Sequence, residues 1–370
     1  MLLLAGELSG DEHAAALARE LRARLPKVRL RGIGGPGMAA AGVELLAGLD
    51  DLAVMGFSEI VPRLEFFRTL EQRITELLHD DTIDLVIPVD YPGFNLRIAA
   101  AAKERGRRVL YFIPPKAWAW RAGRARKLAE RTDRVAVILP FEAEFFSAAG
   151  ADARFVGNPL LDRPDDVMDS AEFHARHGLD PERPVLAVLP GSRRQEIGRH
   201  RAPFRGALDR VIAARPDVQP VVGRAATLPE DLFSGFGVPV VDDTRALLRH
   251  AAAGLVKSGT STLEAALEGT PMVVPYITSA FSWAIVRRVL RTDYVALPNL
   301  IAGREVVPEL IQDRATEELL AMALLPLLDP GSDEVARQRS GLRDVCERLG
   351  EPGAAQRVAD LALELMGVAQ

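Results

Sequence analysis

Short apolar runs alternate with longer amphipathic segments along most of this chain, and this alternation limits the folds open to it. Strands that alternate with helices pair in parallel and carry the helices on both faces of the sheet. We expect strands at Leu2–Ala5, Leu30–Ile33, Leu85–Pro88, Val109–Phe112, Val135–Ile138 and Arg154–Val156, and helices at Glu12–Leu25, Val61–His79, Phe94–Arg105, Arg124–Glu130 and Phe141–Ala149. The pattern predicts an α/β fold with a doubly wound sheet.

The alternation is interrupted by the polar, turn-rich segment Asp162–Asp166 and then begins again. Further strands are expected at Val185–Leu189, Val218–Val222, Val238–Val241, Gly254–Val256 and Met272–Val274, followed by a mostly helical tail from Val335 to Met366. A chain of 370 residues is long enough for two domains. We therefore predict two doubly wound domains facing a cleft, at residues 1–161 and 168–345, followed by a tail helix at 346–370. Whether this tail helix packs back on the first domain stays open. Ligands of such sheets bind outside the carboxyl ends of the strands.

Composition excludes several classes of protein. Hydrophobic residues make up 48% and charged residues 26%, as in a globular protein, and the net charge of −5 argues against a nucleic-acid partner. The single cysteine, Cys346, rules out an internal disulfide and fits a reducing compartment. The six histidines lack metal-ligand spacing, so we expect no metal and no cofactor. No apolar stretch reaches the roughly 18 residues of a membrane span, so any membrane contact would be peripheral.

Two loops of the second half favour an anionic ligand. Ser258, Gly259 and Thr260 form a small-residue turn between an apolar run and a helix, where unpaired N–H groups and the helix dipole attract an anion. One helical turn further on, Glu264 can reach a ribose diol. The alternative is an ordinary Ser/Thr helix cap.

The second such loop is Leu189–Glu196. Gly191 and Ser192 offer backbone donors, and Arg193 can neutralise a departing diphosphate. Since both loops end strands of one sheet, they could clamp a pyrophosphate together; a helix cap followed by surface arginines is the alternative. A third loop places Asn299 between a proline and an apolar pair, which is typical of a cleft-facing loop or of a plain connector.

Loops of the first half favour a hydroxyl-bearing acceptor. Gly6, Glu7, Ser9 and Gly10 follow the first strand, and the acidic residues nearby disfavour a phosphate; capping by Ser9 and Asp11 is the alternative. Asp90 follows the strand Leu85–Pro88 and is our candidate general base, although it could instead cap the next helix. Asn95 could hydrogen-bond the acceptor.

Aromatic and apolar residues suggest contacts with sugar or lipid. Trp118, Trp120 and Arg121 form a compact aromatic–basic unit that suits sugar rings, acyl chains and phosphate, or else a tryptophan-anchored interface. In the amphipathic segment that begins at Ile60, Leu64, Phe67, Ile74 and Leu78 keep helical spacing and are expected in the core. Val61, Phe66 and Leu70 could be surplus apolar surface that docks on a membrane or an acyl chain.

Taken together in order, these motifs closely resemble the lipid-A-disaccharide synthases, glycosyltransferase family 19. The resemblance runs from about residue 2 to about residue 330. It rests on Gly6–Asp11, Val54-Met55-Gly56, Asp90–Asn95, Trp118–Arg121, Leu189–Arg193, Ser258–Glu264 and Leu297–Arg304.

The resemblance implies a GT-B fold and an inverting, metal-independent hexosyltransferase. Such an enzyme transfers 2,3-diacylglucosamine from UDP to the 6-hydroxyl of 2,3-diacylglucosamine 1-phosphate, giving the β-1,6-linked disaccharide 1-phosphate and UDP. It would act peripherally on the cytoplasmic face of the inner membrane, and a homodimer stays open. Asp90 matches the base, Arg193, Ser258–Thr260 and Glu264 match the UDP region, and Asn299 matches a cleft position.

The chain departs from the family pattern at Gly37, Pro115, Lys116, Asn158, Ile277 and Lys257. The last adds a positive charge directly before the Ser258–Thr260 turn. Two alternatives therefore stay open beside the synthase: an isomerase resembling UDP-N-acetylglucosamine 2-epimerase, and a divergent GT-B transferase acting on another glycolipid. A binding module without catalysis is a further possibility, which would bind UDP but release none from a donor.

Overall fold

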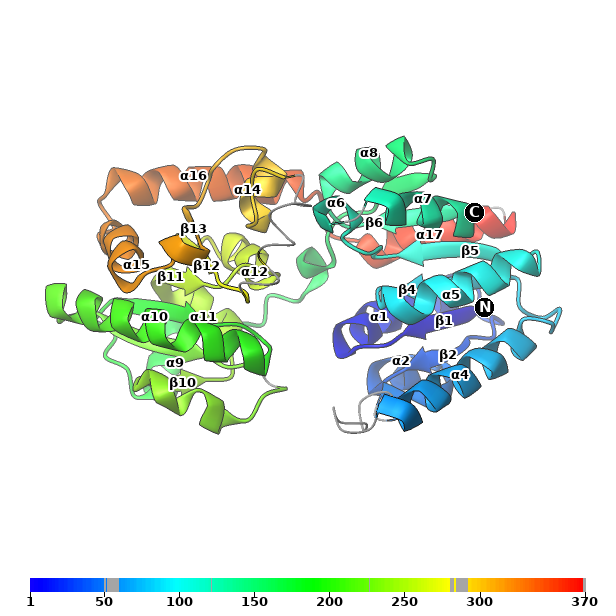
Figure 1. The fold of residues 1–370 in the computed structure, drawn as a ribbon, viewed down its shortest axis with the longest axis horizontal. Coiled ribbons are helices and arrows are strands. Elements are labelled where there is room, and N and C mark those ends of the chain that lie inside the picture. The colour runs from blue at the N-terminus through cyan, green and yellow to red at the C-terminus, as the bar shows by residue number, and fades with distance from the viewer. Residues whose placement is uncertain are drawn as a thin grey trace. The chain divides into compact units, whose positions relative to one another are not determined.

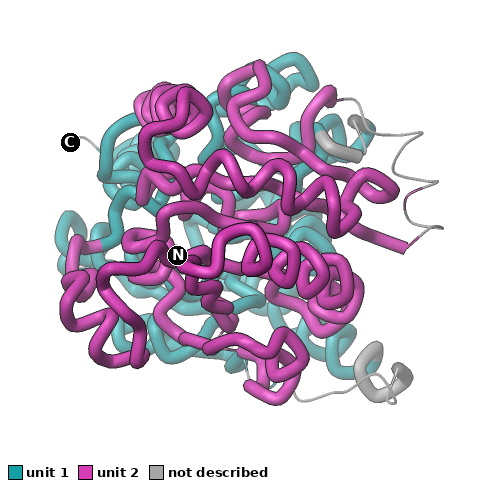
Figure 2. Tube along the Cα trace, turned by 90° about the vertical axis from the view of Figure 1, so that its left-hand side faces the viewer, with its two compact units in different colours: residues 1–163, 349–370 teal, residues 164–348 magenta. Residues whose placement is uncertain are grey.

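The computed structural model describes residues 1–49, 51, 60–120, 122–225, 227–279, 283 and 292–368, with backbone alone at 60–64, 119, 120 and 122 (Figure 1). The chain divides into two compact units, coloured separately in Figure 2. Unit 1 comprises Met1–Arg163 and Leu349–Gln370, and unit 2 comprises Pro164–Arg348. The chain therefore leaves unit 1 after Arg163 and returns to it at Leu349.

Unit 1 is built on a seven-stranded sheet in the order β3-β2-β1-β4-β5-β6-β7, in which every neighbouring pair is parallel. Its strands are β1 (Leu2–Ala5), β2 (Arg31–Gly34), β3 (Glu44–Gly48), β4 (Leu85–Val89), β5 (Arg108–Phe112), β6 (Arg134–Val137) and β7 (Ala153–Phe155). Its helices are α1 (Leu8–Arg24), α2 (Pro36–Ala40), α4 (Ile60–Leu77), α5 (Pro92–Glu104), α6 (Ala117–Trp120), α7 (Ala122–Arg131), α8 (Pro140–Ala148), the 3₁₀ helix η1 (Pro159–Asp162) and α17 (Ala354–Met366).

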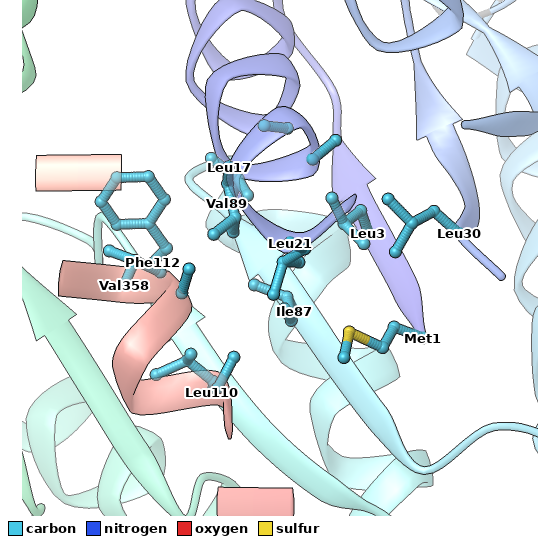
Figure 3. Packing of buried hydrophobic residues seen from close by; sticks show 14 of the residues in the cluster. Met1, Leu3, Leu17, Leu21, Leu30, Ile87, Val89, Leu110, Phe112 and Val358 are labelled. Atoms are coloured by element: carbon cyan, nitrogen blue, oxygen red, sulfur yellow. The ribbon is translucent and has the colours of Figure 1, made fainter. Parts of the chain in front are cut away.

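Both faces of this sheet are buried, because successive side chains of a strand point to opposite sides. Leu3 of β1, Leu17 and Leu21 of α1 and Val358 of α17 belong to one buried cluster, in which Val358 lies beside Phe112 (Figure 3). Leu2 and Leu4 pack on the other side, in a cluster that includes residues of α4 and α5. The continuous apolar strand β1 is thus a central strand covered on both faces.

The C-terminal helix α17 is part of unit 1. Arg357 donates to the carbonyl of Val156 at 2.7 Å, and Arg134 pairs with Glu364 at 2.6 Å. Val358, Ala359 and Ala362 are fully buried in the same cluster as α1. The last segment of the chain therefore completes the core that the first segment begins.

Unit 2 contains a six-stranded sheet in the order β10-β9-β8-β11-β12-β13, again with parallel pairs throughout. Its strands are β8 (Val185–Leu189), β9 (Gln219–Gly223), β10 (Val240–Val241), β11 (Ala251–Val256), β12 (Met272–Tyr276) and β13 (Glu309–Ile311). Its helices are α9 (Ser170–His177), α10 (Arg194–Ala214), α11 (Thr244–His250), α12 (Ser261–Leu267), α14 (Leu297–Ala302), α15 (Glu317–Leu324) and α16 (Asp333–Arg348), with 3₁₀ helices η2 (Glu230–Leu232), η3 (Ser234–Phe236), η4 (Gln312–Arg314) and η5 (Leu325–Leu328). These two parallel sheets with their helices confirm the predicted α/β class.

The apolar segment α4 differs in part from the sequence prediction. Leu70, expected as surplus surface, is buried, and Phe66 is partly buried against the core beside Phe67. The side chains of Val61 and Leu64 are outside the described part of the structure. Leu70 is therefore a core residue and Phe66 packs against the core, because α4 packs this stripe against α5 and the sheet.

Candidate functional site

The two loops predicted to bind an anion lie side by side in unit 2. They follow β8 and β11, which are neighbouring parallel strands with Leu189 opposite Val256. The backbone N–H of Lys257 donates to the carbonyl of Leu189 at 2.9 Å, so the pairing extends to the point where both loops begin. The sheet thus places both loops at its carboxyl edge, where ligands of such sheets bind.

Glu196, in the first turn of α10, ties these loops together. Its Oε2 accepts the backbone N–H of Ser192 at 3.1 Å. Its Oε1 lies 3.1 Å from Nη1 of Arg193 and 2.9 Å from Nζ of Lys257. Burial by itself would raise the pKa of the Glu196 carboxyl, but the hydrogen bond and charge of Lys257, helped by Ser192 and Arg193, hold that pKa below its usual range. Glu196 was not predicted as a site residue from the sequence, where its spacing of three from Arg193 was the available signal.

The turn before α10 needs a glycine. Gly191 has φ of +128°, and a Cβ added there would lie 2.7 Å from Oε2 of Glu196. Arg193 is the N-cap of α10, and 74% of its side chain is exposed. Contrary to expectation, the N–H of Ser192 is not open to a ligand, because Glu196 accepts it. Arg193 thus presents an accessible cation at the start of a long helix, whose dipole favours an anion.

Ser258 has a structural role that the sequence did not reveal. Its hydroxyl donates to the carbonyl of Val295 at 3.0 Å, and its N–H donates to the carbonyl of Pro275 at 3.1 Å. Ser258 is buried, so we correct its assignment as a ligand-contacting residue. Gly259 and Thr260, at the N-terminus of α12, and the half-buried Glu264 remain candidates.

Asn299 is also a structural residue. It is fully buried in α14, and its amide nitrogen donates to the Val307 carbonyl and to Glu309, each at 2.8 Å. Its Oδ1 accepts the N–H groups of Val306 and Val307 at 2.7 and 3.0 Å. The predicted cleft-facing role is therefore wrong: the side chain holds the segment before β13, as a buried amide must satisfy its own donors and acceptor.

In unit 1, the loops after β1 and β4 are neighbours, with Ala5 opposite Val89. Gly6 packs so closely on Tyr91 that an added Cβ would lie 2.3 Å from the ring. Glu7 is the exposed N-cap of α1 and makes no capping hydrogen bond with its side chain. Ser9 is exposed in the first turn, whereas Gly10 is buried against Ala5. Glu7 and Ser9 are thus the accessible polar groups at this edge.

Asp11 does not cap its own helix. Its carboxylate accepts the N–H groups of Gly35, Gly37 and Met38 at 2.7, 2.9 and 3.0 Å, which caps the N-terminus of α2. Only 1% of Asp11 is exposed. Helix α1 also starts at Leu8, before the predicted Glu12, because Ser9–Asp11 form its first turn.

Asp90 occupies a strained position at the end of β4. Asp90 and Tyr91 have φ of +49° and +48°, a conformation that costs energy in residues with a Cβ. The Asp90 backbone is held by its N–H donation to the Phe112 carbonyl at 3.0 Å and by the Tyr111 hydroxyl, which donates to its carbonyl at 2.8 Å. Burial, and next the charge of Glu7, raise the pKa of the half-buried carboxyl. A fixed carboxylate with a raised pKa suits a general base.

Asn95 supports Asp90 instead of contacting a ligand. It is 1% exposed, and its amide nitrogen lies 2.7 Å from the Asp90 carbonyl and 3.1 Å from the Leu4 carbonyl. This corrects its assignment to acceptor binding. A buried amide joins the ends of β1 and β4 here, because carbonyls at strand ends need donors once the ladder stops.

Trp118 is likewise a packing residue. It is 8% exposed, its Nε1 donates to Oε1 of Glu142 at 2.9 Å, and its ring packs edge-on against Phe141. Burial raises the pKa of Glu142 to about 7, even though hydrogen bonds from Trp118 and Leu139 act to lower it. Trp118 is therefore not available for stacking on a sugar. Arg121 and Val54-Met55-Gly56 lie outside the described residues, as does the side chain of Trp120.

No group of three or more His, Cys, Asp or Glu side chains in the described ranges could hold a metal ion. Among the helices that the structure describes, none combines the length and apolar character of a membrane span.

Solved structures with the same two-sheet plan define the class. A putative UDP-N-acetylglucosamine 2-epimerase from Listeria monocytogenes superposes with a TM-score of 0.69 at 13% identity, covering 100% of this chain and 97% of that one. The glycosyltransferase of kitacinnamycin superposes with a TM-score of 0.60 at 19% identity, covering 98% of both chains. The fold is thus that of the GT-B glycosyltransferases and related epimerases, in agreement with the predicted fold class.

Sequence comparison narrows this class to one family. The lipid-A-disaccharide synthase of Anaeromyxobacter sp. (strain K) is 41% identical over 376 residues, covering 99% of this chain and 97% of the relative. That of Pseudomonas syringae pv. tomato is 38% identical over 373 residues, with the same coverage. The family model for lipid-A-disaccharide synthetase matches residues 1–363. The chain belongs to the lipid-A-disaccharide synthase family, as its motifs predicted, and is a glycosyltransferase.

Proposed function

We propose that the chain transfers 2,3-diacylglucosamine from its UDP conjugate to the 6-hydroxyl of 2,3-diacylglucosamine 1-phosphate, with inversion and without a metal. The observation that carries this proposal is a family match over residues 1–363, which includes every candidate loop in both units. Inversion requires direct attack: the bond from C1 to the acceptor oxygen forms as the bond from C1 to UDP breaks. The hydroxyl proton must leave, and the bonding electron pair departs with UDP.

In this proposal Asp90 takes the proton of the acceptor hydroxyl. Its fixed backbone and raised pKa support the role, since a general base works best when its pKa approaches the working pH. Glu7 and Ser9 are exposed after the neighbouring strand β1 and supply polar contacts for the acceptor sugar. Gly6 and Gly10 lack side chains, which lets the start of α1 pack closely against Tyr91 and Ala5. Asn95 keeps the Asp90 loop in place.

Arg193 stabilises the negative charge that develops on UDP. It is exposed at the N-terminus of α10, where the helix dipole adds to its charge. Gly191, the hydroxyl of Ser192, Gly259 and Thr260 line the same edge of the sheet, and Glu264 is assigned to the ribose. In the absence of a metal, these preorganised groups would carry the stabilisation of the leaving group.

The substrates carry acyl chains, so we propose a peripheral position on the cytoplasmic face of the inner membrane. The substrates of the family support this placement. We propose no nucleic-acid partner. Asn158, one of the residues that depart from the family pattern, is buried, and its Oδ1 accepts the N–H of Leu160 at 3.0 Å at the start of η1.

The test is UDP release by purified protein from UDP-2,3-diacylglucosamine, with and without 2,3-diacylglucosamine 1-phosphate and with a chelator present. Release that requires the acceptor and yields a disaccharide supports the proposal. Conversion of UDP-N-acetylglucosamine without an acceptor would instead support the isomerase. UDP binding without release from this donor would leave a binding module or a transferase with another acceptor.

A further inference from the structure

The donor-side loops of unit 2 contain a carboxylate at the place where an anion is expected to bind. Glu196 lies between the β8 and β11 loops and contacts Arg193, Lys257 and the N–H of Ser192. A carboxylate alone at this position would repel a diphosphate. The contacts of the Glu196 carboxylate show which groups it holds and which cations neutralise its charge.

The contacts of Glu196 differ in how tightly they are enclosed. The side chains of Glu196 and Lys257 are 15% and 13% exposed, whereas that of Arg193 is 74% exposed. The ion pair between Glu196 and Lys257 is thus the enclosed, fixed part of the cluster. Arg193 is anchored to it by one nitrogen at 3.1 Å and otherwise faces solvent.

Neighbouring groups fix this ion pair further. Nζ of Lys257 lies 5.7 Å from the centre of the Tyr276 ring, at the end of β12. Nδ1 of the buried His200 lies 2.8 Å from the Glu196 carbonyl, and its Nε2 accepts the N–H of Ile277 at 3.2 Å. Burial lowers the pKa of His200 to about 4, so the ring is neutral and adds no charge. Three strand ends, those of β8, β11 and β12, therefore meet at one lysine–glutamate pair.

We propose that Glu196 is a positioning residue of the donor site and that Lys257 is its counter-ion, so that together they aim Arg193 and the Gly191–Ser192 turn at the diphosphate. One carboxylate with two cations leaves a net charge of +1, which is compatible with an anionic ligand. This inference rests on the proposed donor site in unit 2.

Charge and positioning make opposite predictions for Glu196→Gln. If the cluster acted by charge alone, loss of the carboxylate would raise the net positive charge and tighten UDP binding. If Glu196 positions Arg193 and the turn, UDP binding weakens, and we expect its Kd to rise about 10-fold because charge-assisted contacts are lost. Lys257→Met should weaken UDP binding by a similar factor, and Lys257→Arg should restore it.

The experiment is calorimetric titration of UDP and of UMP into the full-length wild type and each variant, with thermal unfolding of every protein. Asp209→Asn is the matched control, since Asp209 also pairs with an arginine of α10, at 2.9 Å from Arg205, outside the cluster. The proposal predicts that the ratio of UDP to UMP affinity falls in Glu196→Gln and Lys257→Met and is unchanged in the control.

Two outcomes would overturn the proposal in distinguishable ways. Wild-type protein that binds no UDP removes the donor site, and with it the proposed function. Wild-type protein that binds UDP, together with Glu196→Gln that binds it equally well or more tightly, removes only the positioning role. If Glu196→Gln does not fold, the comparison of Lys257→Met with Lys257→Arg decides: equal UDP affinity in both would contradict the role of the counter-ion.

Discussion

At the scale of single residues, Asp90 combines backbone strain with a perturbed carboxyl. Two consecutive residues with positive φ are stable here because Phe112, Tyr111 and Asn95 each bond the Asp90 backbone. Strain that neighbouring contacts enforce in this way is often found at functional positions. The proposed role of Asp90 as a base thus depends on the residues that hold its loop.

We predict that Asp90→Asn lowers turnover by about 10²- to 10⁴-fold, the range typical for loss of a general base. UDP affinity should be unchanged, because the donor loops belong to unit 2. Steady-state kinetics with calorimetry of UDP binding separates the two effects. Asp84→Asn, an exposed position just before the other end of β4, is the control and should keep full activity. Turnover that survives in Asp90→Asn would remove Asp90 as the base.

The pH dependence of turnover tests the same residue. The base acts when it is deprotonated, so kcat/KM should rise with pH through the pKa of Asp90. Burial and Glu7 raise that pKa, so the acidic limb should lie above the usual range of an aspartate. Glu7→Gln removes one of the causes and should shift the limb to lower pH; a limb that stays in place would contradict this origin.

At the scale of elements, buried carboxyls link helices to one another. Glu142, in the first turn of α8, accepts the indole N–H of Trp118 in α6 and the N–H of Leu139 at 3.1 Å. Asp11 of α1 caps α2 through three N–H groups. Such contacts join different helices. They account for Trp118, which the sequence suggested for sugar contact, and for Asp11, which the sequence suggested as a cap of its own helix.

We predict that Glu142 makes unit 1 less stable as pH rises from about 5 to about 7. Its pKa is raised by burial from 4.5 to about 7, so the folded state holds a proton that the unfolded state has released in this interval. The free energy of unfolding must then fall with rising pH. Urea titrations at several pH values should show a shallower pH dependence in Glu142→Gln than in the wild type; equal slopes would contradict the raised pKa.

The sequence predicted every central strand of the two described sheets, whereas among their four edge strands it predicted β7 and β10 and missed β3 and β13. Strands such as β1 and β4 are buried on both faces and appear as continuous apolar runs, so their positions were evident. The edge strand β3 is half exposed and β13 has only three residues, and neither was predicted. Edge strands need less apolar sequence, because one side of their ladder has no neighbour.

In the candidate site, the positions of the loops were predictable from the sequence, but the orientations of their side chains were not. Strand ends in a parallel sheet are predictable, and Asp90 and Arg193 follow the ends of β4 and β8, while their roles stay predictions. The orientation of polar side chains within these loops was not predictable: Asn95, Asn299 and Ser258 turn inward to bond backbone groups. That need arises from carbonyls and N–H groups on distant segments, which local sequence does not show.

At the scale of the whole chain, unit 1 is closed by its own C-terminal segment. Val358 of α17 belongs to one buried cluster with Leu17 and Leu21 of α1 (Figure 3), and Arg357 bonds the Val156 carbonyl. The first and last parts of the chain must therefore fold together, whereas residues 164–348 form a unit of their own. The effect of a ligand on the stability of each unit can therefore be measured separately.

Donor binding should accordingly protect one unit. If the UDP site lies at the β8 and β11 loops, saturating UDP stabilises unit 2 by RT ln(1 + [UDP]/Kd), about 2.7 kcal/mol at 100 times Kd, provided that the unfolded state does not bind. Amide hydrogen exchange of the full chain should then slow in β8, β11 and the first turns of α10 and α12, and not in β1, β4 or α17. UMP should protect α10 less than UDP does, because it lacks the second phosphate. Protection of equal size in α1 and α5 would mean that UDP also contacts unit 1, and would require Asp90 to be reconsidered as part of the donor site.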